Sequence, residues 1–205
     1  LPSSFFQNGT NVVAVEVHQS SASSSDLSFD LELFGNDNVP SVHRGAYLQI
    51  ATPTSMVIKW KTDVPTNARV RHGPAPGSLV SFVDDATVSF DHEVTVTGLQ
   101  PATTYYYSIG TTTAELAGNN ATHVFRTSPL PGSIAPKRIW VTGDQGTANN
   151  DQAQVRDAYL NFTGATTADA WIWLGDNTYF QGWEAEYQRT NFDVYTSIFR
   201  NTPSW

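Results

Sequence analysis

The chain contains no cysteine, so it can form neither a disulfide nor a zinc site built on thiolates. It also lacks a run of about 20 apolar residues, and we therefore expect no membrane span. Basic side chains are scarce: 11 Lys and Arg stand against 19 Asp and Glu, and the formal net charge is −8. Because the charges are scattered, this balance argues against a nucleic-acid partner held by bulk charge.

Methionine is nearly absent as well. The chain starts with Leu1-Pro2 and its one methionine is Met56, which indicates a processed or cut piece with any signal peptide outside it. The 205 residues are 40% hydrophobic and 12% aromatic, which is enough for packed cores in one or two domains.

Residues 1–35 predict only two strands, at 12–17 and 27–33. Two strands cannot form a stable core by themselves, so we expect this segment to be the carboxyl-terminal remnant of an upstream module. The sequence from Asn8 to Asp30 resembles the closing strands of galactose-binding-like jelly rolls found in large secreted bacterial proteins. That resemblance implies carbohydrate as a partner of the upstream module.

Short predicted strands separated by turn residues occupy the segment 42–128. Their spacing is typical of an antiparallel β-sandwich, and Trp60 falls in mid-strand, where such a core takes a large aromatic side chain. The segment from Leu99 to Tyr105 resembles the approach to the penultimate strand of fibronectin type III domains, in which the tyrosine packs the corner. We therefore expect an immunoglobulin-like sandwich. The expected strands are 46–50, 56–62, 68–72, 80–83, 92–97, 104–109 and 123–126.

Beyond a proline-rich linker, the domain 136–205 changes to strand, helix, strand, helix. Continuous apolar strands are predicted at 138–143 and 170–175, and helices at 152–162 and 183–199. This order predicts a right-handed parallel unit, which leaves a sheet edge and an apolar face uncovered unless further strands close it. The predicted helical stripes are Val155, Ala158, Tyr159 and Phe162, then Trp183, Tyr187, Val194 and Ile198. The expected fold class is thus multidomain β plus α/β: a sandwich followed by an incomplete, truncated βαβα unit.

Each of the two apolar strands ends in Gly-Asp. Neighbouring parallel strands end at the same edge of a sheet, about 4.8 Å apart, so Asp144 and Asp176 are expected to lie close together. Two carboxylates at that spacing repel each other unless a cation neutralises them, and a hard multivalent metal is the simplest such cation. Tyr179, three residues after Asp176, offers a further oxygen ligand.

Each residue alone also admits an ordinary structural role. An aspartate after a strand can simply cap the following helix. Tyr179 can be a buried aromatic residue beside Phe180 and Trp183. The occurrence of both aspartates at equivalent strand ends favours the metal site.

An immunoglobulin-like domain followed directly by Gly-Asp-x-Gly and Gly-Asp-x-x-Tyr resembles the purple acid phosphatases, which belong to the calcineurin-like metallophosphoesterase superfamily. The resemblance extends from about Arg44 to Trp205 and includes Val57-Ile-Lys-Trp60. It implies that Asp144 is a terminal carboxylate ligand of a ferric ion and that Asp176 bridges two metals. It also implies that Tyr179 is the phenolate ligand whose charge transfer gives the colour.

The cofactors implied by the resemblance are Fe(III) and a divalent metal (Zn, Fe or Mn) in the full-length protein. Hard oxygen ligands suit Fe(III), and an anionic phenolate lowers its reduction potential. Two metals about 3.5–4 Å apart can clamp a phosphate ester and activate water. The metal ligands expected in this sequence are Asp144, Asp176 and Tyr179.

The later histidine motifs of the family are absent from the sequence. All five histidines precede Asp144, and we interpret each as structural or solvated; they are His18, His43, His72, His92 and His123. Since three ligands cannot assemble a working dinuclear centre, the 205-residue chain alone is expected to be inactive. The missing motifs are expected to begin within about ten residues after Trp205, as the resemblance implies.

The leading hypothesis is therefore part of a secreted or cell-surface bacterial acid phosphatase that hydrolyses phosphate monoesters. One alternative is a surface or glycan-binding multidomain protein whose metallophosphoesterase-like part is inert. Another is a diesterase or nucleotide-hydrolysing member of the same superfamily. The first and second hypotheses differ in whether the histidine motifs exist.

Overall fold

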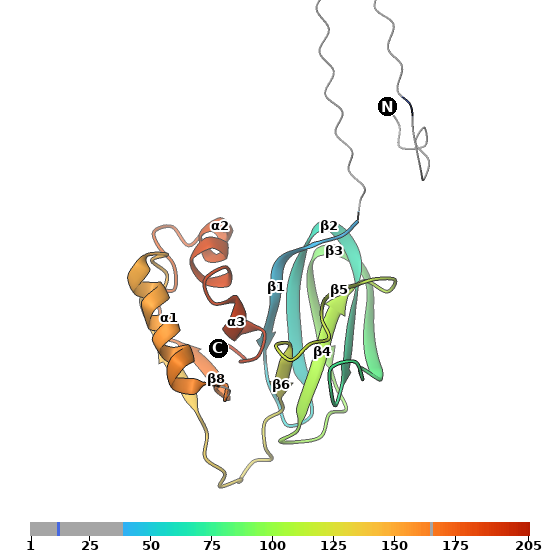
Figure 1. The fold of residues 1–205 in the computed structure, drawn as a ribbon, viewed down its shortest axis with the longest axis horizontal. Coiled ribbons are helices and arrows are strands. Elements are labelled where there is room, and N and C mark those ends of the chain that lie inside the picture. The colour runs from blue at the N-terminus through green and yellow to red at the C-terminus, as the bar shows by residue number, and fades with distance from the viewer. Residues whose placement is uncertain (1–11, 13–38, 165) are drawn as a thin grey trace, which may run out of the picture. The chain divides into compact units, whose positions relative to one another are not determined.

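The computed structural model of the chain describes residues 39–164 and 166–205, together with Val12. The predicted jelly-roll remnant at 1–35 thus lies outside the described residues, apart from Val12. The part Asn38–Trp205 forms one compact unit, in which a β-sandwich is followed by a smaller α/β segment (Figure 1). No helix in the described part is long and apolar enough to cross a bilayer.

The sandwich is built from antiparallel pairs only. Its strands are β1 Val42–Gln49, β2 Met56–Gly73, β3 Ser81–Val96, β4 Thr104–Gly110, β5 Glu115–Gly118 and β6 Val124–Arg126. The expected strands all fall within or beside these, whereas β5 was not predicted.

Two long strands replace four shorter predicted ones. The first part of β2 pairs with β1 and with the end of β3, and its last part pairs with β4 and with the start of β3. Register shifts between Lys61 and Ala68 mark the change of partner. The chain therefore passes from one layer to the other by a bulged bend, where separate strands were predicted.

The sandwich core confirms the predicted role of Trp60. Its side chain is 1% exposed and lies among Leu48, Ile58, Val70 and Ile109, which are as deeply buried. The predicted tyrosine corner is also present, because the Tyr105 hydroxyl accepts a 2.9 Å hydrogen bond from the backbone N–H of Gln100.

The α/β segment contains the predicted parallel pair. Strand β7 (Ile139–Thr142) aligns with β8 (Ala170–Trp173), and helix α1 (Asn150–Thr163) connects them. Asn149 caps α1 by accepting a 3.0 Å hydrogen bond from the N–H of Gln152. Among the described strands β7 pairs only with β8, so its other edge is open.

The apolar stripe predicted on α1 is only partly buried. Tyr159 stacks on Trp140 with the ring centroids 3.9 Å apart. Val155 and Phe162, in contrast, are 55% and 84% exposed. The sequence predicted an uncovered sheet edge and an uncovered apolar face for a two-stranded unit. The open edge of β7 and the exposed part of this stripe match that prediction.

The prediction of one long helix at 183–199 is wrong. The segment forms α2 (Glu184–Tyr187), the π-helical turn η2 (Gln188–Phe192) and α3 (Thr196–Phe199). Thr190 and Asn191, both fully buried, bond to the loop after β8, so the apolar stripe is interrupted by polar contacts. Trp183, expected on that stripe, is 67% exposed.

The sandwich and the α/β segment are joined by specific contacts. The Arg44 guanidinium on β1 donates to Gln188 Oε1 at 2.7 Å and lies 4.1 Å from the centre of the Phe192 ring. Tyr47 packs against the same ring, and the N–H of Ser204 donates to the carbonyl of Leu48. Strand β1 is therefore the support on which the α/β segment rests.

Candidate metal centre

The two predicted aspartates lie just beyond the ends of β7 and β8: Gly143 separates Asp144 from β7, and Leu174 and Gly175 separate Asp176 from β8. Asp144 and Asp176 both lie in the left-handed region, with φ of 56° and 49°, a conformation that aspartate tolerates better than most residues. The N–H of Asp144 donates a 3.1 Å hydrogen bond to the carbonyl of Gly175. The two aspartates thus share a left-handed backbone conformation, and their turns are linked through the backbone.

Tyr179 completes a cluster of three oxygen-bearing side chains. Its hydroxyl donates to Asp144 Oδ1 at 2.5 Å, and Asp176 Oδ2 lies 3.2 Å away. The hydrogen bond to Asp144, followed by burial and the bond to Asp176, holds the pKa of the Tyr179 phenol well above its usual value. The predicted proximity is therefore present; that these oxygens bind metal stays a prediction.

The donor set is limited to two carboxylates and one phenol. Nowhere in the described part of the chain do three His, Cys, Asp or Glu side chains gather as a metal-binding group. Two histidines clearly have the structural role expected of them in the sandwich: His92 bonds to the Thr62 hydroxyl at 2.9 Å, and His123 bonds to Asn120. His18 lies outside the described residues.

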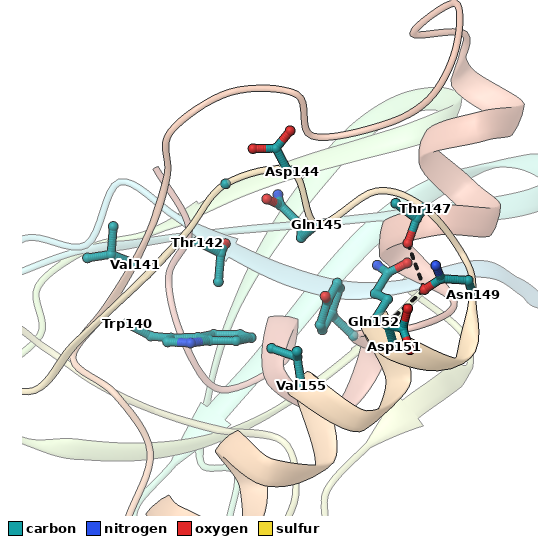
Figure 2. A pocket seen from close by; sticks show the side chains of 12 residues that line it. Trp140, Val141, Thr142, Asp144, Gln145, Thr147, Asn149, Asp151, Gln152 and Val155 are labelled. Atoms are coloured by element: carbon teal, nitrogen blue, oxygen red, sulfur yellow. Dashed lines mark hydrogen bonds between the residues drawn. The ribbon is translucent and has the colours of Figure 1, made fainter.

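A hollow of about 510 Å³ adjoins the candidate centre (Figure 2). It lies between β7, the following loop and the start of α1, and Asp144 and Gln145 are at one end of it while Trp140 is at the other. Asp176 and Tyr179 do not line this hollow. Asp144 and Asp176 are nevertheless exposed and Tyr179 is partly exposed, so a solute can reach the three oxygens.

Sequence reasoning missed the polar side chains beneath these turns. Gln145 Nε2 donates a 3.0 Å hydrogen bond to Asn177 Oδ1, and Asn191 Nδ2 donates to the backbone carbonyl of Asn177 at 2.6 Å. One signal was available in the sequence: an amide residue directly follows each of the two aspartates.

Comparisons with known proteins relate the sandwich to phosphatases. Residues 44–127 match the model of the purple acid phosphatase N-terminal domain. The chain is 32% identical over 113 residues to purple acid phosphatase 15 of Arabidopsis thaliana, an alignment covering 55% of this chain and 20% of that protein. The chain therefore spans about one fifth of the length of this relative.

Among solved structures, PhoD aligns with 78% of this chain and 37% of its own, at 14% identity and a TM-score of 0.56. This likeness shows the fold, a β-sandwich followed by an α/β segment. The FN5 domain of Drosophila Lar aligns with 44% of this chain and 98% of its own, at 21% identity and a TM-score of 0.34. Through residues 44–127, this chain is related to the purple acid phosphatases.

Proposed function

We propose that Asp144, Asp176 and Tyr179 are metal ligands of a secreted acid phosphatase that hydrolyses phosphate monoesters. The observation that carries the proposal is the convergence of the three oxygens at the carboxyl edge of a parallel strand pair. The relation of residues 44–127 to purple acid phosphatases supports it. An open α/β sheet binds its ligands at this edge.

The donors fit a hard cation. Carboxylate and phenolate oxygens suit Fe(III): Asp144 and Asp176 would hold it as carboxylates and Tyr179 as a phenolate, and Asp176 would also serve a divalent Zn, Fe or Mn ion. Such a metal pair, when bound, supplies Lewis-acid charge and an activated water for attack on the ester. The residues of this chain contribute by holding three oxygens at an accessible surface, so that a phosphate group can approach.

Fe(III) titration followed by visible absorption tests the ligand assignment. A tyrosinate-to-iron charge-transfer band is expected in the wild-type chain and should be lost in Tyr179→Phe, because the coordinating oxygen is removed. Tyr187→Phe, a nearby tyrosine that makes no contact with either aspartate, is the matched control and should keep the band. A band that persists in Tyr179→Phe contradicts the assignment.

Turnover is tested separately. The 205-residue chain should release no phosphate from an aryl phosphate monoester above the blank, because a second metal needs more ligands than the three described. The longest polypeptide that the gene encodes should hydrolyse the monoester faster than a diester. If that polypeptide binds Fe(III) and hydrolyses neither substrate, the phosphatase proposal is wrong.

A further inference from the structure

An amide side chain directly follows each candidate ligand at the two strand ends. Gln145 follows Asp144, and Asn177 follows Asp176. Gln145 is 7% exposed, and its Nε2 donates to Asn177 Oδ1 at 3.0 Å. The two loops are therefore tied together one residue away from their carboxylates.

Asn191 holds Asn177 from the π-helical turn η2. Its side chain is 0% exposed, and Nδ2 donates a 2.6 Å hydrogen bond to the backbone carbonyl of Asn177. The neighbouring Thr190 shares a 2.8 Å hydroxyl–hydroxyl bond with Thr178. Short π-helical turns occur frequently at functional sites. Here the buried residues of the turn hydrogen-bond to the segment between Asp176 and Tyr179.

Gln152 of α1 extends the network to the first loop. Its Oε1 accepts from the N–H of Ala148 at 2.5 Å, and its Nε2 donates to the carbonyl of Thr190 at 2.6 Å. One chain of hydrogen bonds thus connects the loop after β7, helix α1 and the turn η2. Through η2 it also reaches the loop after β8.

The loops after β7 and β8 pack closely against each other at Gly146. A Cβ atom at this position would lie 2.1 Å from the carbonyl oxygen of Asn177 and 2.3 Å from the Cα of Thr178. Because glycine carries no Cβ, the backbones of the two loops can touch here.

Stability alone does not account for these amides. Gln145 Oε1 and Asn191 Oδ1 are buried with no hydrogen-bond partner in the described part of the chain, and an unpaired buried acceptor is unfavourable. The left-handed backbone at Asp144 and Asp176 adds local strain beside them. Strain and unmet polar groups that the surrounding contacts maintain tend to mark functional geometry.

We propose that Gln145, Asn177 and Asn191 are positioning residues that fix the spacing of the three oxygens of Asp144, Asp176 and Tyr179. Their role in metal binding rests on the proposed function. The coupling of the two loops is a property of the metal-free chain as well, so the two ideas can be tested apart.

The first test measures Fe(III) affinity of the full chain by titration. Gln145→Met keeps the side-chain length and removes the donor, and Asn177→Ala removes the acceptor. Each should weaken Fe(III) binding by about tenfold at unchanged stoichiometry, as the loss of an outer-shell partner typically does. Because the two variants break the same hydrogen bond, the double variant should bind Fe(III) as tightly as the single variant with the lower affinity.

A matched control separates positioning from general stability. Asn67 is a sandwich amide that also makes two hydrogen bonds, to Thr112. Asn67→Ala should lower the Tm and leave Fe(III) affinity unchanged. Full additivity of the Gln145 and Asn177 effects, or an equal loss of affinity in Asn67→Ala, overturns the proposal.

The second test needs no metal. In metal-free protein, Gln145→Met should speed amide hydrogen exchange at Asp144 and also at residues 176–179, on the loop that carries no substitution. If the wild-type chain binds no Fe(III), the proposed function fails while the exchange data still decide whether the loops are coupled. Unchanged exchange at 176–179 overturns the coupling.

Discussion

The sandwich and the α/β segment of this chain differ in how completely they bury their apolar side chains. The sandwich encloses a core of its own, which includes Trp60, Tyr107 and Phe125, each at most 1% exposed. The α/β segment has a smaller core cluster of four buried side chains, stacked aromatic rings and, on α1, an exposed apolar stripe. The candidate centre therefore belongs to the α/β segment, which has the smaller core and packs against β1 of the sandwich.

The largest expected effect distinguishes the two cores. Trp60→Ala should cost about 3–5 kcal/mol of unfolding free energy, because a fully buried ring leaves a cavity in the sandwich. Trp171→Ala, at 0% exposure, should cost a similar amount but release only the α/β segment. Chemical denaturation measures the loss of unfolding free energy in each variant, and amide hydrogen exchange shows which region unfolds. If Trp171→Ala exposes sandwich amides as well, the two regions are one cooperative unit.

A pH effect is expected from the sandwich. Burial, with a smaller effect of nearby Arg200, lowers the pKa of His123 to about 4. As pH falls from about 6.5, the unfolded state takes up the proton first, so up to about 3 kcal/mol of stability is lost by pH 4. His123→Leu should reduce the loss of stability between pH 7 and pH 4.5 in urea unfolding, and the remaining loss is expected from His72 and His92, whose pKa values burial also lowers. A control at exposed His43, also changed to leucine, should retain the slope.

The smallest expected effect concerns the joint between the regions. Arg44→Met removes the bonds of the guanidinium to Gln188 and Glu184, and should destabilise the α/β segment by about 2 kcal/mol. The sandwich core should keep its protection from hydrogen exchange. The matched control is Arg126→Met, whose guanidinium bonds only within the sandwich, to the carbonyl of Ala102. Equal loss of protection in both regions would contradict this prediction.

Local pattern was enough for the strands and the two Gly-Asp turns. Alternation and turn chemistry located most sandwich strands, whereas the tyrosine corner was implied by the resemblance of the segment from Leu99 to Tyr105 to fibronectin type III domains. The four-residue β5 was missed, because Glu115–Gly118 is short and at most half-buried. The helix at 183–199 failed because Thr190 and Asn191 turn inward to bond to a distant loop, a contact that periodicity does not encode.

The sequence by itself determined that two aspartates lie at the ends of neighbouring parallel strands and that a tyrosine three residues after the second lies within reach. The physical reason is that apolar strands joined by a helix pair in parallel and end at the same edge of the sheet. Only the tertiary structure decided what holds these side chains in place. Gln145 meets Asn177 across 32 residues, and Asn177 meets Asn191 across 14. Such bonds form only when separate elements are packed together, so no local rule predicts them.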